Sequence, residues 1–330
     1  MNSSALLSEP FRTVLMLAAL VIICAGMKGA ATMIGPLFFA VYLAVIFGIL
    51  IRWLERKGVP HIPAVAAGIV LFLAIIAGIT ILMAVYISQL VRQLPLYQAG
   101  LESRVVLFTA MARDQGIDIA SVPVSDLLSV IPGAFGSALA GLGNSITIVL
   151  LIVITPIFLI LDAGMFLETL RSSLEGRPDV RAKIEKLGRE IIRYLVIRSE
   201  VNCATGIGIG VLLAFIGVDF AILWAFLAFL LSFIPYLGFW IAVIPPALLA
   251  WTQFGPASAI LVILGGVVIN EIAENILFPQ LAGYELKISP AVVLLSVFFW
   301  GWILGIFGAL LAVPLTLCLK LLYEVSGEQA

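Results

Sequence analysis

Eight long apolar runs constrain the fold of this chain more than any other feature of its sequence. They lie at residues 12–28, 32–52, 62–87, 143–162, 200–217, 219–250, 257–278 and 290–320. A run of about 20 apolar residues can cross the hydrocarbon core of a bilayer as a helix. Charged residues make up 11% of the chain, against roughly 25% in an average soluble domain. We therefore predict an all-α, polytopic membrane protein with about eight transmembrane helices.

The distribution of lysine and arginine predicts the orientation, because these residues gather in cytoplasmic loops. With the N-terminus inside, most of them lie on the cytoplasmic face, and both termini are expected there. The segments are then residues 1–87 for spans one to three, 88–142 for an external amphipathic segment, 143–162 for span four, 163–199 for a cytoplasmic amphipathic region, 200–320 for spans five to eight and 321–330 for a cytoplasmic tail.

An amphipathic helix is predicted over residues 178–199. Its stripe positions recur at steps of four and three and hold Val180, Ile184, Leu187, Ile191, Tyr194 and Arg198. Charged side chains fill most of the remaining positions. This helix is expected to lie on the membrane or against a neighbouring subunit, and a solvated charged face is the open alternative.

The sixth apolar run is too long for one straight crossing and contains several helix-disrupting residues. Pro235 and Gly238 lie near its middle, and Pro245 and Pro246 follow. Proline inside a helix removes a backbone hydrogen bond, which in lipid requires neighbouring protein or water as a substitute. We predict a kinked helix or two half-helices at a functional cavity or hinge.

The seventh run contains two acidic residues, Glu271 and Glu274, inside the apolar segment. With Asn270 and Asn275 they form one polar helix face, since these residues are three and four positions apart. Two close carboxylates in a low dielectric disfavour double ionisation, so this face could couple transport to protons. The structural alternative is that Glu271 fixes helix packing and Glu274 pairs with Lys287.

Other polar residues are weaker candidates for a cavity or gate. Asn202 and Thr205 stand at the start of the fifth span, and Tyr236 stands beside the break in the sixth. Tyr236 could equally be a packing or interfacial tyrosine. Asp162 ends the fourth span and is a gate candidate, although carboxylates at helix ends are common.

Several function classes find no support in the sequence. The net charge of -1 argues against a nucleic-acid partner. Cys24, Cys203 and Cys318 lie far apart without metal-ligand spacing, and no catalytic or phosphate-binding motif is found. We therefore expect neither enzyme activity nor a cofactor or metal.

Three separated motifs resemble one family of bacterial membrane proteins. They are IPYLG with IPP (Ile234 to Gly238, Ile244 to Pro246), ENILFPQLAG (Glu274 to Gly283) and SVFFWGWILGIFGALLAVPLT (Ser296 to Thr316). Their order and spacing are similar to those of the autoinducer-2 exporter family, also called PerM-like permeases. Pro279 and Gly283 become hinge candidates within the second motif. Family members often have a basic residue after that proline, but this chain has Gln280.

The resemblance implies a transporter of the bacterial inner membrane, with the lipid bilayer around it, that assembles as a homo-oligomer, namely a pentamer. The function it favours is export of a small polar solute such as autoinducer-2, with proton coupling through Glu271 and Glu274. A sodium or lithium/proton antiporter is an alternative that the same resemblance allows. A non-transporting scaffold that binds a partner through residues 178–199 is the third.

Overall fold

The computed structural model describes residues 9–114, 146–174, 176, 178–282 and 289–327, and all its regular elements are helices. The helices are α1 (Glu9–Gly29), α2 (Ala31–Arg56), α3 (His61–Asp114), α5 (Ile146–Leu161), α6 (Ala163–Ser173), α7 (Pro178–Ile216), α8 (Ala221–Leu231), α9 (Gly238–Phe254), α10 (Pro256–Ile272), the π-helical turn η2 (Ala273–Leu277), α11 (Phe278–Ala282), α12 (Pro290–Leu310) and α13 (Ala312–Gly327). Five helical segments in the described part are long and apolar enough to cross a membrane. The prediction of an all-α polytopic membrane protein is confirmed.

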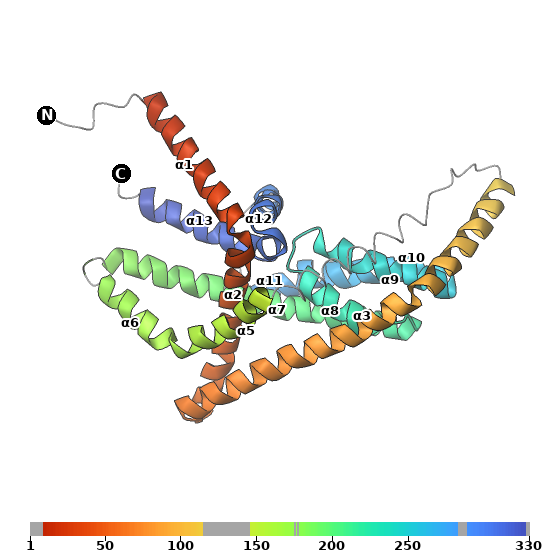
Figure 1. Ribbon diagram of the computed structural model, residues 1–330, viewed down its shortest axis with the longest axis horizontal. Helices are drawn as coiled ribbons and strands as arrows, with labels where there is room; N and C mark the ends of the chain where they lie inside the picture. The colour runs from red at the N-terminus through yellow and green to blue at the C-terminus, as the bar shows by residue number, and fades with distance from the viewer. Residues whose placement is uncertain (1–8, 115–145, 175, 177, 283–288, 328–330) are drawn as a thin grey trace.

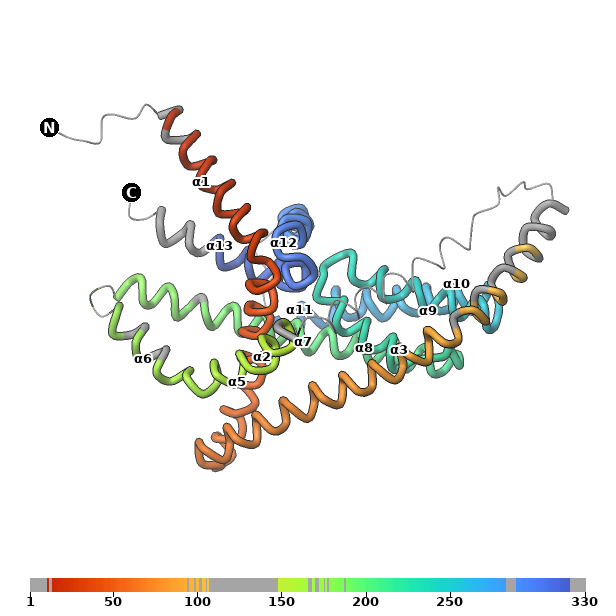
Figure 2. The backbone as a smooth tube through the Cα atoms, in the orientation of Figure 1, coloured from red at the N-terminus to blue at the C-terminus, as the bar shows by residue number. Residues whose placement is uncertain are grey.

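The helices form two groups on either side of α2, which stands across the centre of the molecule (Figure 1). On one side α8, α9 and α10 pack beside the second half of α7, and α3 runs diagonally along them. On the other side lie α5, α6 and the charged first half of α7. Helices α1 and α13 extend toward the same side, as the tube in Figure 2 also shows.

Helix α3 is longer than the sequence predicts. It continues over 54 residues to Asp114, whereas we expect the third span to end near residue 87 and short helices to follow. Leucine, glutamine and arginine dominate residues 89–96, and these are good helix formers. Pro95 lies inside the helix without ending it. Residues 115–142 of the expected external segment lie outside the described residues.

The sixth apolar run is broken into α8 and α9, in agreement with the half-helix alternative. The two half-helices form a hairpin whose ends meet, because Gln253 Nε2 donates to Asp219 Oδ2 at 2.5 Å. Because the hairpin returns to the side where it starts, α10 runs antiparallel to α7. If the sixth run crossed the membrane once, the fifth and seventh spans would be parallel. As a result the helical turn after α10 lies beside the charged part of α7, where Arg198 contacts Glu274.

The predicted eighth span, 290–320, is also interrupted, inside α12 at Gly305 and again between α12 and α13. Gly305 has a positive φ of 64°, a conformation that favours glycine. The chain folds back there, and Trp300 Nε1 donates to Thr316 Oγ1 at 3.0 Å. A Cβ on Gly308 would lie 2.0 Å from the carbonyl oxygen of Trp300, so this close turn requires glycine.

Candidate functional site

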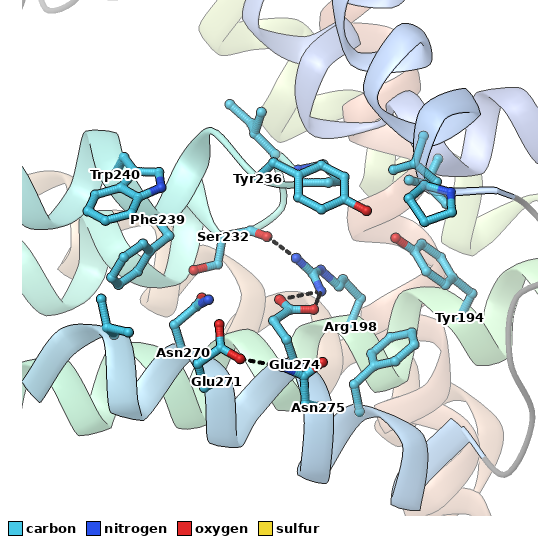
Figure 3. A pocket seen from close by; sticks show the side chains of 17 residues that line it. Tyr194, Arg198, Ser232, Tyr236, Phe239, Trp240, Asn270, Glu271, Glu274 and Asn275 are labelled. Carbon is cyan, nitrogen blue, oxygen red and sulfur yellow. Dashed lines mark hydrogen bonds and ion pairs between the residues drawn. The ribbon is translucent and has the colours of Figure 1, made fainter. Parts of the chain in front are cut away.

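The break between α8 and α9 faces the end of α10 across a cavity of about 470 Å³. Its walls come from α7, the α8–α9 break, α9, α10, η2 and the starts of α11, α12 and α13 (Figure 3). The lining residues are Tyr194, Arg198, Ser232, Ile234, Pro235, Tyr236, Phe239, Trp240, Val267, Asn270, Glu271, Glu274, Asn275, Phe278, Pro290, Val293 and Val313.

An ion pair between α7 and η2 forms one wall of the cavity. Arg198 Nη1 donates to the two carboxylate oxygens of Glu274 at 2.7 and 2.8 Å. Arg198 Nη2 donates to the carbonyl oxygen of Ser232, the residue that follows α8. The arginine side chain is 7% exposed and that of Glu274 34%. A buried charge requires such partners, so the pair connects α7, the hairpin tip and η2.

The second acid, Glu271, has a different environment. Its Oε2 accepts a hydrogen bond from Asn275 Nδ2 at 2.5 Å, and both side chains are exposed at the cavity. Among the described residues no ion pair is formed by Glu271. The helix widens to a π turn at Ala273–Leu277, a distortion often found at functional sites. The two carboxylates therefore differ: Glu274 is neutralised by Arg198, and Glu271 is held by an amide.

The hairpin tip contributes an apolar and aromatic wall. Tyr236 has a φ of 63°, which is unusual for a residue with a side chain. Its ring faces the acidic residues across the cavity, and Phe239 and Trp240 line the same space (Figure 3). Gly238 begins α9 at a tight break, because a Cβ there would lie 1.7 Å from the carbonyl oxygen of Leu231. A substitution at Gly238 would therefore displace the tip.

The structure brings together six of the residues that the sequence singles out: Asn270, Glu271, Glu274, Asn275, Pro235 and Tyr236. Asn202 and Thr205 are buried in α7 and do not line the cavity. Pro245 and Pro246 lie inside α9, Pro279 lies in α11, and Asp162 lies between α5 and α6. Gly283 lies outside the described residues.

Arg198 is a cavity residue that is not among the predicted site residues, although its position in the sequence contains a signal. Arg198 occupies the apolar stripe of the 178–199 helix, four positions after Tyr194. A charge on a buried stripe needs a partner, and the stripe therefore points to an acid elsewhere. Arg198 pairs with the carboxylate of Glu274. Lys287, the alternative partner, lies outside the described residues, so that pairing stays a prediction.

The chemistry of the lining fits a small polar molecule. It offers amides at Asn270 and Asn275, a phenol at Tyr236, and aromatic faces that can cover an apolar side of a ligand. The described residues contain no group of three or more histidine, cysteine or acidic side chains suited to a metal ion. With both acids ionised, one carboxylate is left over after the Arg198 pair, and this opposes binding of an anion.

Known proteins that resemble this chain over nearly its whole length are transport proteins. The family model for AI-2E family transporters matches residues 14–326. The AI-2 transport protein TqsA of Escherichia coli K12 is 32% identical over 331 residues, covering 97% of this chain and 94% of that protein. A putative transport protein of Haemophilus influenzae is 31% identical over 327 residues, with 97% and 94% covered. YrrI of Bacillus subtilis, also a putative transport protein, is 24% identical over 307 residues, with 87% and 84% covered.

Proposed function

This chain belongs to the AI-2E transporter family and is a multi-pass membrane transporter, and on that premise we propose that it exports a small polar solute such as autoinducer-2. The observation that carries the proposal is the cavity between the hairpin tip and η2, with polar groups on one wall and aromatic rings on the other. The name of the E. coli relative, an AI-2 transport protein, supports the choice of solute.

The lining favours a neutral ligand over an anion. Asn270, Asn275 and Tyr236 can exchange hydrogen bonds with hydroxyl and carbonyl groups, and Trp240 and Phe239 can pack on carbon atoms. Arg198 is already bound to Glu274 and Ser232. A ligand carboxylate or phosphate would have to displace Glu274 from this buried cation, which costs the existing pair.

We also propose that Glu271 is the residue that binds and releases a proton during export. Protonation of Glu274 would leave the guanidinium of Arg198 buried without its counter-charge. Protonation of Glu271 leaves no such charge, and the neutral acid can still accept a hydrogen bond from Asn275. The sequence suggests proton coupling through Glu271 and Glu274 together, and we now propose Glu271 alone as the proton-binding residue.

The test uses the purified protein in liposomes that contain a pH-sensitive dye. A proton gradient is imposed, and autoinducer-2 or sodium is added in separate trials. We expect proton movement with autoinducer-2 and its loss in Glu271→Gln, with solute movement no longer dependent on the gradient. Glu200→Gln is the matched control, because Glu200 is exposed on α7 and does not line the cavity.

Each other outcome has a distinct meaning. Proton movement with sodium alone would replace export by the antiporter function. Movement of autoinducer-2 without proton movement would contradict the proposed proton coupling and support the proposed export. No movement of either would favour a scaffold that binds a partner through residues 178–199. Cytoplasmic termini and homo-oligomeric assembly remain predictions that these trials do not address.

A further inference from the structure

A second polar position lies beside the cavity, buried in the contact between α7 and α8. Asn202 is completely buried, and within the described structure neither its Oδ1 nor its Nδ2 has a hydrogen-bond partner. The Nε of Arg198, one turn earlier on α7, is buried and unpartnered in the same way. Buried polar groups are almost always hydrogen-bonded, so three unmet atoms on adjacent turns point to a bound ligand.

The spacing places these atoms along one face of α7. Residues 198, 202 and 206 recur every four positions, and such residues lie one above another on a helix. Both flanking positions contact the α8 side: Arg198 binds the carbonyl of Ser232, and a Cβ on Gly206 would lie 2.7 Å from the carbonyl oxygen of Ala225. Asn202 therefore lies between them, facing α8 next to the Arg198 wall of the cavity.

The unmet atoms select the kind of ligand. They comprise two donor nitrogens, Arg198 Nε with one N–H and Asn202 Nδ2 with two, and one acceptor, Asn202 Oδ1. A metal cation would meet the N–H groups of both nitrogens and the guanidinium charge, which repel it. An anion would meet Oδ1 and an arginine whose charge Glu274 already balances. A water molecule can accept both donors and donate to the acceptor.

We propose that an ordered water molecule bridges Arg198 Nε and the side-chain amide of Asn202, which makes Asn202 a positioning residue for the cavity. The other two nitrogens of the guanidinium are already directed to Glu274 and to Ser232. The water supplies a hydrogen bond to Nε, so that each of the three guanidinium nitrogens has a partner. A water in such a site makes about three hydrogen bonds to buried polar groups.

The test is a double-mutant cycle on thermal unfolding in detergent, which requires neither a substrate nor the proposed transport function. Asn202→Leu is combined with Arg198→Lys, which keeps the charge and removes the Nε–H. We expect Asn202→Leu to lower Tm by about 2–4 °C in the native chain and to leave Tm unchanged or higher in the Arg198→Lys background. Asn202→Ser, which can still bind water, should recover part of the loss.

Thr205→Val is the control, because Thr205 Oγ1 donates to Val201 O on its own helix at 3.1 Å. Its effect should be the same in both backgrounds. An increase in Tm for Asn202→Leu in both backgrounds would overturn the proposal, since it would mean that the amide is unpaired. An equal decrease in both would also overturn it, by placing the partner elsewhere. If Arg198→Lys does not fold, a high-resolution map of the native protein decides, and a lack of density between the two side chains would overturn the proposal.

Discussion

The two ends of the α8–α9 hairpin are both held by polar side chains, but in opposite environments. At the tip, the buried guanidinium of Arg198 binds Ser232 O and Glu274. At the base, an exposed acid meets two half-buried side chains: Tyr97 Oη donates to Asp219 Oδ2 at 2.7 Å, and Gln253 Nε2 donates to the same atom. Burial makes the tip contacts costly to form and to break, whereas water can replace the base contacts. The comparison indicates that the tip serves the cavity and the base serves the fold.

The base has a second role, because it attaches the long helix α3 to the hairpin. Tyr97 lies on the part of α3 beyond the predicted span, and Arg104 Nη2 donates to Gln253 O at 3.3 Å. These contacts fix the position where the hairpin starts and ends. The tip can then be set by its own contacts with α7 and η2, some distance from α3 (Figure 1).

The largest expected effect is at the tip ion pair. Arg198→Met leaves Glu274 without its partner, and breaking a buried pair costs about 3–5 kcal/mol. Because Glu274 is one-third exposed, we expect about 3 kcal/mol or less, together with loss of transport. Chemical or thermal unfolding measures the loss of stability, and export from liposomes measures the loss of transport.

A double variant separates the charge from the packing in this prediction. Arg198→Met with Glu274→Leu removes both charges, and replacing a buried pair by apolar residues is often neutral. The double variant should therefore recover most of the stability and none of the transport. If it is as unstable as Arg198→Met alone, the lost contact to Ser232 outweighs the ion pair.

The next effect tests the shape of the tip. Gly238→Ala puts a Cβ 1.7 Å from the carbonyl oxygen of Leu231, and overpacking of this kind costs about 1–3 kcal/mol. Since the clash is with backbone, we expect the upper part of that range and reduced export. Gly164→Ala is the control, because Gly164 is helical and exposed, and a Cβ there meets nothing within 4 Å. Equal stability of the two variants would show that the tip can relax.

The sequence predicts the site better than it predicts the path of the chain. Glu271, Asn275 and the break at Pro235 are local signals, in which a few neighbouring residues determine a face or an interruption. The pairing of Arg198 with Glu274 joins residues 76 positions apart. This pairing depends on the direction of α10. That direction depends on whether α8 and α9 cross the membrane as one continuous helix or fold back as a hairpin. Helix propensities do not distinguish these two arrangements. The fold-back at Gly305 could not be predicted either, because the apolar pattern of residues 290–320 is the same for one long helix and for two shorter ones.

A smaller effect is expected at Tyr236, where the backbone is strained. A left-handed conformation destabilises a residue with a side chain by about 1–2 kcal/mol, and a glycine avoids this strain. A glycine also increases the conformational entropy of the unfolded chain, which lowers the stability by about 0.4–1 kcal/mol. We expect Tyr236→Gly to change stability by about 1 kcal/mol or less. Its export should be weaker at low solute concentration, because a ring lining the cavity is lost. Unaltered concentration dependence would place the solute away from the tip.

The smallest effect is expected at the base, where Tyr97→Phe removes only the hydroxyl group. A hydrogen bond contributes about 0.5–1.5 kcal/mol, and because Asp219 is exposed we expect the lower part of that range, with export retained. Burial, followed by the hydrogen bond to Asp219, raises the pKa of the Tyr97 hydroxyl. A raised folded-state pKa gives stability that is fully present below the unfolded value of about 10 and is lost as pH rises above it. The difference in Tm between native chain and variant should therefore be constant from pH 6 to 9 and shrink above about pH 10. If Tyr97→Phe instead abolishes export while the fold is intact, the base takes part in transport, and the division between a functional tip and a structural base is wrong.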